Sequence, residues 1–250
     1  MRLTLLGTGN AAGMPLYGCN CVRCIEVQET TALRRGPAHA LLEVENKRYL
    51  IDAGMMDIAD RFPAGTLDGI FVTHFHPDHV QGLFHLRWGI GDKIPVYHPT
   101  DNEGCADLYK HAGILDFQVQ KKYEAFELGG VKITPLPLIH SKPTIGYLFE
   151  YKSQRVAYLV DTKGIPSRAE ELLNNGNQLD ALVVDTYFQP GIENQNHNNL
   201  DDTLALHKVI GPKKTVMTHI GHDFDVWLTT HSNTLPDDVV PGHDGYVAFP

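Results

Sequence analysis

The 250-residue chain has few cysteines, no excess of basic side chains and no long hydrophobic run. Its 30 acidic side chains outnumber the 21 basic ones, which gives a formal net charge of -9. A surface of that charge repels phosphate backbones over distance, so we expect no extensive nucleic-acid binding, although bound metal ions can reverse the field inside a pocket. No apolar window approaches the roughly 18 residues needed to span a bilayer, so we expect no membrane partner.

The first residues, MRLTLLGTGN, lack the pattern of a signal peptide, because their apolar run is short and glycines interrupt it. We therefore expect a cytoplasmic protein, in which thiols stay reduced. The four cysteines then favour a metal-binding or packing role over a disulfide. The 14 histidines favour metal binding as well, since histidine is the commonest metal ligand.

Short β-rich runs recur along the chain, and several are continuous apolar stretches that suit strands covered on both faces. These runs lie at 2–6, 40–44, 48–51, 70–73, 131–138, 146–151, 155–160, 181–185 and 215–218. Residues 103–112, 167–175 and 200–210 fit helices best. The pattern predicts an α/β fold, with a pair of mixed sheets and outer helices, in a single domain over 1–250.

The segment GTGNAAG follows the first β-rich run and faintly resembles a dinucleotide-binding loop. Its glycine spacing differs from G-x-G-x-x-G, and Gly13, Pro15 and Gly18 oppose the helix that such a loop must open. We interpret the segment as a plain turn that leads the chain to the cysteines that follow.

The strongest motif is THFHPDH, which follows the apolar run IFVT and therefore lies at the end of a strand. His74 and His76 are two residues apart, which places both imidazoles on one side of an extended segment. Pro77 then turns the chain, so that Asp78 and His79 can face the same centre from another direction. Four ligand-type side chains within six residues suit two metal ions better than one ion with an open position.

H-x-H-x-D-H at a strand end resembles the signature of the metallo-β-lactamase superfamily, and the resemblance extends over the whole chain. The later ligands of that family also follow strands, and the chain offers His140 in PLPLIHSK, Asp161 in AYLVDTKG and His219 in VMTHIGHD. The resemblance implies an αββα sandwich of two mixed sheets with outer helices. It also implies two ligand sets: His74, His76 and His140 for one ion, and Asp78, His79 and His219 for the other, with Asp161 bridging them.

Two divalent ions about 3.5–4 Å apart could share a water, convert it into a bridging hydroxide near neutral pH and hold phosphoryl oxygens. Histidine and carboxylate ligands are compatible with zinc, manganese or iron. The resemblance favours manganese among these three.

The segments GCNCVRC, FVTHFHPDHVQGLFHLRWG, PLPLIHSK and THIGHDFDVWL together resemble one specific family. It is the cyclic phosphodiesterase family of the carbon–phosphorus lyase pathway of phosphonate breakdown, which is similar to the tRNA 3′-processing nucleases. The resemblance implies a homodimer that hydrolyses a small phosphorylated sugar, 5-phosphoribosyl 1,2-cyclic phosphate, to ribose 1,5-bisphosphate.

Cleavage of such a diester needs a proton donor, because the departing sugar oxygen becomes an alkoxide. The polar loop NQNHNNL offers His197, and the resemblance implies that His197 is the general acid and that Asp78 is catalytic as well as a ligand. Lys142 and Lys163 each lie two residues after an expected ligand and could reach a substrate phosphate.

Three other functions remain open. A tRNA 3′-processing endonuclease shares the ligand set but carries an RNA-clasping arm, and the sequence has no glycine- or lysine-rich insertion of that kind. A thioester or lactam hydrolase of the same fold is the second alternative. A di-iron redox protein resembles this fold too, but it usually has glutamate at the position of His76.

The stretch GCNCVRC brings Cys19, Cys21 and Cys24 within six positions, one ligand short of a tetrahedral zinc set. The fourth cysteine of the chain, Cys105, lies in a predicted helix with no neighbouring ligand. A lone cysteine of that kind is usually a small packing residue.

His222, three residues after His219, would complete a Cys₃His set, which is a standard closed zinc site. The resemblance supports His222 as the fourth ligand and implies a structural zinc. That zinc would anchor the N-terminal loop 18–24 to the segment that presents His219 to the catalytic metals.

Overall fold

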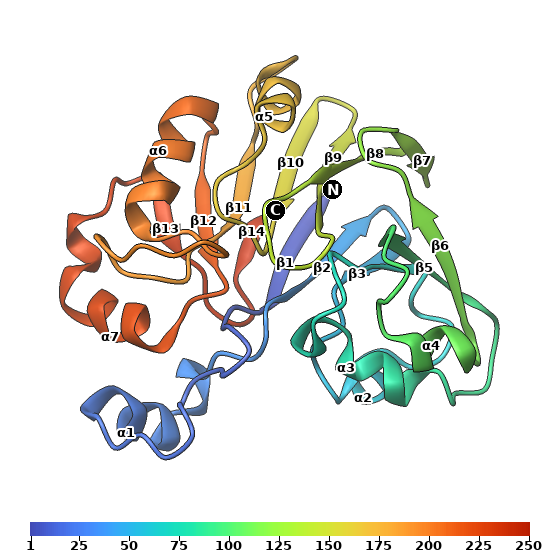
Figure 1. Cartoon of the computed structure of the whole chain (residues 1–250), viewed down its shortest axis with the longest axis horizontal. Helices are drawn as coiled ribbons and strands as arrows, with labels where there is room; N and C mark the ends of the chain where they lie inside the picture. Colours follow the sequence, from blue (N-terminus) through green and yellow to red (C-terminus); the bar gives the residue numbers. More distant parts are fainter.

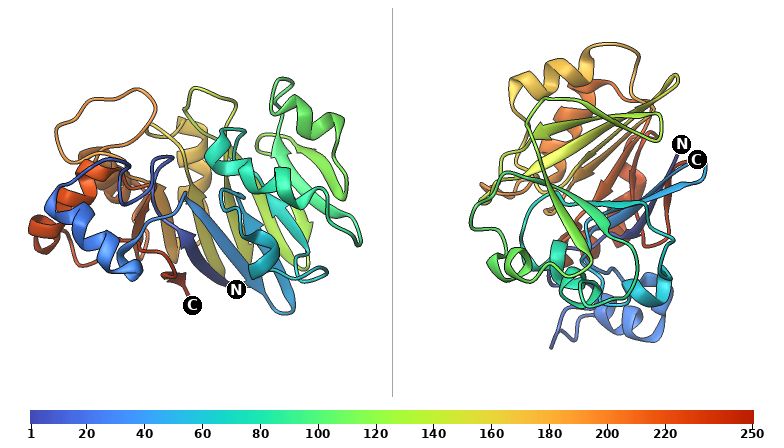
Figure 2. Two further views of the ribbon diagram at one scale, coloured as in Figure 1. Left: turned by 90° about the horizontal axis from the view of Figure 1, so that it is seen from below. Right: turned by 90° about the vertical axis from the view of Figure 1, so that its right-hand side faces the viewer.

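The computed structural model describes residues 1–250, whose strands form two mixed sheets. The strands of the first sheet are Arg2–Gly7 (β1), His39–Val44 (β2), Lys47–Ile51 (β3), Gly69–Phe71 (β4), Ile94–Pro99 (β5), Leu115–Gln120 (β6) and Val247–Phe249 (β14). They are arranged in the order β14-β1-β2-β3-β4-β5-β6. Because β1 and β14 are neighbours, the two ends of the chain lie close together (Figure 2).

The strands of the second sheet are Phe126–Leu128 (β7), Val131–Pro137 (β8), Ile145–Tyr151 (β9), Gln154–Leu159 (β10), Ala181–Asp185 (β11), Thr215–Thr218 (β12) and Val239–Pro241 (β13). Their order is β13-β12-β11-β10-β9-β8-β7. In each sheet an antiparallel part continues into a parallel part, which begins at the β3–β4 pair in the first sheet and at β10–β11 in the second.

The α-helices are Val22–Glu29 (α1), Ile58–Arg61 (α2), Pro77–Leu86 (α3), Ala106–Lys110 (α4), Ser167–Asn174 (α5), Leu200–Ile210 (α6) and His222–His231 (α7), with short 3-10 turns at Thr31–Leu33 and Ser232–Thr234. Helices α2, α3 and α4 cover the first sheet, whereas α5, α6 and α7 cover the second (Figure 1). Helix α1 lies away from both sheets, beside α7 (Figure 1). The predicted αββα sandwich of two mixed sheets with outer helices is confirmed.

A core of 23 buried side chains fills the space between the sheets. Leu3 and Leu5 of β1 contribute to it, as the alternation of side chains along a strand requires. Tyr147 of β9 links the two layers directly, because its buried hydroxyl donates to the carbonyl oxygen of Val72 at 2.8 Å. No helix combines the length and apolar character that crossing a bilayer would require.

Two predicted helices are observed almost as expected, at α5 and α6. Helix α6 begins with a capping box, in which the side-chain oxygen Oδ1 of Asn199 accepts from Asp202 N–H at 2.9 Å and the Asp202 carboxylate accepts from Asn199 N–H at 2.9 Å. It ends at Gly211, whose φ of 59° is the left-handed conformation that glycine adopts at helix ends.

The predicted helix at 103–112 is wrong in its first part, because only Ala106–Lys110 is helical. The carboxylate of Asp101 accepts hydrogen bonds from the N–H groups of Glu103 and Gly104, at 3.0 and 2.8 Å. These bonds hold the segment in a turn that competes with the helix. Cys105 is therefore the residue that precedes α4.

Candidate functional site

The motif THFHPDH follows β4 and runs directly into α3, which begins at Pro77. Pro77 is favourable there because the first helical N–H has no partner within the helix. Asp78 and His79 therefore sit on the first helical turn, while His74 and His76 precede it in extended backbone.

Asp52, at the end of β3, forms hydrogen bonds with both the extended part and the helical part of this motif. It was not predicted from the sequence. Its buried carboxylate accepts from Thr73 N–H at 2.7 Å and from the Thr73 hydroxyl at 2.8 Å. The same carboxylate lies 2.8 Å from His79 Nδ1, which must donate to it. His79 therefore keeps its Nε2 free as a ligand atom.

Asp161, after β10, lies at the centre of the expected ligand set. Its carboxylate oxygens lie 3.4 to 3.8 Å from ring nitrogens of four histidines: His74, His79, His140 and His219. The first expected set, His74, His76 and His140, groups with Asp161, and all their ligand atoms lie within 4.8 Å of one another. Asp78, His79 and His219 form a second group on the same criterion. The structure thus brings all seven predicted residues together, with Asp161 in reach of both groups.

Several polar atoms in this centre are buried but make no hydrogen bond within the protein. They are His79 Nε2, Asp161 Oδ1 and both ring nitrogens of His219. A buried polar atom without a partner is costly, and bound cations would satisfy these atoms. The donor set of imidazoles and carboxylates fits two divalent ions.

The pKa shifts of the residues in the centre also favour the binding of cations. Burial lowers the pKa values of His74, His76 and His140, which keeps these imidazoles in the neutral form that binds a cation. Burial alone would raise the pKa values of Asp78 and Asp161, but the facing imidazoles of His219 and His79 hold both below their usual range.

The pKa values of the two remaining histidines are shifted in the opposite direction. Burial alone would lower the pKa values of His79 and His219, but the carboxylate of Asp161 holds both above their usual range. The centre therefore stabilises positive charge on that side, where a cation can replace the proton.

His197 lies beside the centre, and its Nδ1 is 2.7 Å from the carboxylate of Asp185. Asp185 is the last residue of β11, is fully buried and was not predicted from the sequence. Since a carboxylate only accepts, His197 Nδ1 donates to it and Nε2 is left for other contacts. The ring stacks against those of Tyr187 and His219, with centroids 4.9 Å away in both cases.

One pocket of about 300 Å³ is lined by His197 and by five of the predicted ligands: His76, Asp78, His140, Asp161 and His219. Besides ligand residues and His197, its walls include Asn10, Ala11, Ala12, Ser141, Tyr187 and Asn196. A pocket of this size with convergent polar groups is typical of a small-molecule site.

The two candidate lysines lie in different places. Lys142 lines a depression that adjoins the pocket and shares His76 and Ser141 with it. Lys163 forms an ion pair with Asp202 and lines a separate depression with residues 191–202. Lys142 thus shares a depression with the predicted ligand His76, whereas Lys163 lines a depression that contains none of the predicted ligands.

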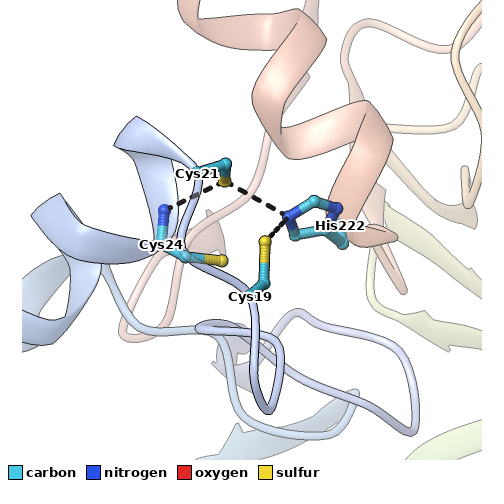
Figure 3. Close-up of side chains that lie close together, drawn as sticks. All are labelled: Cys19, Cys21, Cys24 and His222. Atoms are coloured by element: carbon cyan, nitrogen blue, oxygen red, sulfur yellow. Dashed lines mark hydrogen bonds between the residues drawn. The ribbon is translucent and has the colours of Figure 1, made fainter.

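The cysteine cluster forms a second, separate group. The sulfur atoms of Cys19 and Cys21 lie 3.4 and 3.5 Å from His222 Nε2, and Cys24 points toward the same centre (Figure 3). The ligand atoms of all four residues lie within 4.8 Å of one another, which fits a tetrahedral Cys₃His site. Cys105 is elsewhere and packs beside the outer core of the first sheet.

The electrostatics of this cluster favour metal binding at one thiol. A hydrogen bond from Cys24 N–H, with a second from His222, lowers the pKa of Cys21 to about 6. Burial raises the pKa of Cys24 to about 11. Because a bound metal requires thiolates, Cys21 is more ready to ligate than Cys24, which must lose its proton on binding.

A buried ion-pair network ties the cysteine segment to α7 a second time. The carboxylate of Asp225 accepts from Arg23 Nε and from Arg35 Nε, both at 2.7 Å. Arg35 also donates to the Thr8 hydroxyl at 2.8 Å. The N-terminal part of α7 is therefore tied to the cysteine segment at both His222 and Asp225.

The comparisons with known proteins agree with this geometry. A family model described as "Beta-lactamase superfamily domain" matches residues 47–220. An octanoyltransferase of Porphyromonas gingivalis is 26% identical over an alignment that covers 100% of this chain and 51% of the relative, so the chain spans about half of that protein. A ribonuclease Z of Methanosarcina acetivorans is 26% identical, with 96% of this chain and 90% of the relative covered.

Solved structures extend the similarity over the whole fold. A crystal structure described as a new diphosphatase from the PhnP family has a TM-score of 0.81 and 28% identity, covering 99% of this chain and 96% of that one. Human tRNase Z, short form, has a TM-score of 0.72 and 18% identity, covering 99% and 98%. The second likeness concerns the fold alone.

Proposed function

The chain belongs to the beta-lactamase superfamily, and from that membership and the geometry of the centre we propose that it is a phosphodiesterase that works with two divalent ions. The proposed substrate is 5-phosphoribosyl 1,2-cyclic phosphate, and the proposed product is ribose 1,5-bisphosphate. The observation that carries the proposal is the convergence of seven ligand-type residues, five of which line one pocket together with a histidine paired with a buried carboxylate.

His74, His76 and His140 would hold one ion, and Asp78, His79 and His219 would hold the other, with Asp161 between them. When bound, the two ions polarise phosphoryl oxygens, lower the pKa of an attacking water and neutralise the charge that develops. We propose manganese for these positions. The cysteine set with His222 would hold a structural zinc.

The chain's own acid–base chemistry lies at His197. In hydrolysis, the oxygen of water forms a bond to phosphorus, the bond from phosphorus to the sugar oxygen breaks, and that oxygen needs a proton. Protonated His197 would donate the proton of Nε2 to the leaving oxygen, while Nδ1–H stays bound to Asp185. Asp185 thereby fixes the orientation of the ring, as a positioning residue. The water supplies the proton that restores His197.

Steady-state kinetics on purified protein loaded with manganese test the proposal. The substrates are the cyclic ribose phosphate, bis(p-nitrophenyl) phosphate and a thioester. We expect turnover of both diesters and little of the thioester, with the cyclic ribose phosphate showing the highest kcat/KM. Preference for the thioester would contradict the proposal.

A second candidate function is tRNA 3′ processing, which the similarity to a ribonuclease Z over 90% of that protein favours. The net charge of -9 argues against it, because RNA binding relies on neutralising phosphates. Cleavage of precursor tRNA at a rate comparable with that on the cyclic ribose phosphate would favour this alternative.

We also propose that the protein is a homodimer, as the family resemblance implies. Sedimentation equilibrium tests this: a mass of about twice the 27.8 kDa of the chain is expected, and a mass equal to that of the chain would contradict it.

A further inference from the structure

The loop that follows β1, residues 10–13, forms one wall of the pocket. Its sequence, NAAG, belongs to the segment that the sequence led us to interpret as a plain turn. The segment is indeed a turn, but Asn10, Ala11 and Ala12 line the same pocket as His197 and His219. Neither the predicted metal ligands nor the proposed proton donor gives this loop a role in the pocket.

The loop is held against the segment that carries His219. Asn10 N–H donates to the carbonyl oxygen of Ile220 at 3.3 Å, and Ile220 N–H donates to the carbonyl oxygen of Thr8 at 2.8 Å. Because Ile220 follows His219 directly, Asn10 lies beside the second ligand group.

The orientation of the Asn10 carboxamide is fixed by its surroundings. Its Oδ1 accepts from Ala12 N–H and from Gly13 N–H, each at 3.1 Å. Two donors facing the same atom identify it as the oxygen, so the remaining atom is the amide nitrogen. The residue is only 4% exposed.

The hydrogen bonds of the Asn10 side chain within the protein all go to Oδ1, so the amide nitrogen of this pocket-lining residue is left without a protein acceptor. The backbone N–H of the neighbouring Ala11, an exposed residue, also has no acceptor within the protein. A donor left open in a pocket is a binding group for an oxygen. The side chain is neutral, so it recognises an oxygen by hydrogen bonding and adds no charge.

We propose that Asn10 is a specificity-determining residue, whose amide nitrogen donates to a sugar or phosphate oxygen of the substrate outside the diester that is cleaved. This inference rests on the proposed phosphodiesterase function. The scissile phosphate belongs among the ligand clusters, whereas Asn10 lies on the pocket wall beside Ile220, the residue after His219. The substrate class that this wall selects is a sugar phosphate diester, in preference to a small alkyl or aryl diester.

Two variants separate binding from a structural role of the side chain. Asn10→Asp keeps an oxygen to accept from Ala12 and Gly13, and Asp101 makes the same pattern of bonds in this chain. Asn10→Ser is neutral and keeps a weaker acceptor for the turn. Both variants delete the amide donor. Asn175→Asp, at the exposed end of α5, is the control for added charge.

The experiment measures kcat and KM of wild type and variants on the cyclic ribose phosphate and on methyl p-nitrophenyl phosphate, which has no sugar. For the cyclic ribose phosphate we expect both variants to lower kcat/KM about 10- to 100-fold, mainly through KM. For the methyl aryl diester, Asn10→Ser should stay within about threefold of wild type, as should Asn175→Asp on both substrates.

Equal losses on both substrates would overturn the proposal, because Asn10 would then support the centre in general. Unchanged kinetics in both variants would also overturn it and leave only the turn-forming role. Thermal unfolding and metal content, measured on the same samples, should match wild type in Asn10→Asp. If wild type itself hydrolyses no diester, the proposed function fails before this comparison is reached, so the two failures are distinguishable.

Discussion

The cysteine cluster and the histidine–aspartate centre both suit metal ions, but they are built in opposite ways. The cysteine cluster offers four ligands around one point, in a segment held against α7. The histidine–aspartate centre has more ligands, shared carboxylates and an open pocket. A closed set can only stabilise, whereas an open one leaves room for substrate. His219 and His222 lie three residues apart, so one segment serves both.

The two sites should differ most in their response to a substitution of Asp161, which should affect catalysis and leave the cysteine cluster intact. We expect Asp161→Asn to lower kcat/KM on the cyclic ribose phosphate by roughly 10³-fold or more, because it weakens both ligand groups at once. The Asp161→Asn variant should retain the zinc that we propose for the cysteine cluster. Metal analysis and kinetics on the same sample check this, and near-normal activity would contradict the bridging position of Asp161.

The next largest effect should come from His197, the proposed proton donor, which lies in neither expected ligand group. His197→Ala should lower turnover of the cyclic ribose phosphate by roughly 10²- to 10⁴-fold, since the alkoxide loses its proton donor. Turnover of bis(p-nitrophenyl) phosphate should fall less than about tenfold, because a nitrophenolate leaves without a proton.

Asp185→Asn is the matched variant, because it keeps the shape but removes the carboxylate that His197 contacts. It should show the same contrast between leaving groups, with a smaller loss. Equal losses on both substrates in either variant would refute the assignment of His197 as general acid.

In the cysteine cluster, Cys21→Ser should lower the stability of the fold much more than the rate of catalysis. Loss of the zinc should lower the free energy of unfolding by about 2–5 kcal/mol, as loss of a native cross-link does, and the melting temperature by at least about 5 °C. Turnover per folded molecule should fall only a few-fold, through the position of His219. Cys105→Ser is the control and should keep the zinc. A Cys21→Ser variant that retains all its zinc would show that the cluster is not a zinc site.

The smallest effect on turnover should come from Asp225, the second tie between the cysteine segment and α7. Burial alone would raise the pKa of Asp225, but the guanidinium groups of Arg35 and Arg23 hold it below its usual value. A carboxylate with a depressed folded pKa contributes stability above its unfolded pKa of about 4, and the contribution is lost as pH falls through the folded value.

Asp225→Asn should therefore lower the free energy of unfolding by about 3–5 kcal/mol near neutral pH, because it leaves two guanidinium groups without their carboxylate. The difference from wild type should shrink below about pH 4. Urea unfolding at a series of pH values measures it. A difference that grows toward acid pH would contradict the sign of this argument.

The sequence predicted the parts of the site that carry a dense local signal. Histidines at strand ends and a three-cysteine stretch are visible without a structure, and the sheet pair follows from buried β-rich runs. Asp52 and Asp185 were missed, because each is a single aspartate after an ordinary strand and its partner is distant in sequence. Their position at a strand end, as for Asp161, was the available signal.

The loop at Asn10 was underestimated for a related reason. Its role depends on which segment it faces, and contacts between positions 10 and 220 cannot be read from local pattern. The helix expected at 103–112 was too long because the side chain of Asp101 competes for the backbone. Short strands such as β13 and β14 carry too few residues to show a period.

The most direct test of the two-centre account is the metal content and diesterase activity of wild type, Cys21→Ser and Asp161→Asn, measured side by side. The account predicts that Cys21→Ser loses one zinc per chain and keeps most of its activity per folded molecule. It predicts that Asp161→Asn keeps that zinc but loses the active-site metals and nearly all activity. If both variants lose the same metals and the same activity, the cysteine cluster and the histidine–aspartate centre are not separate sites, and the account is wrong.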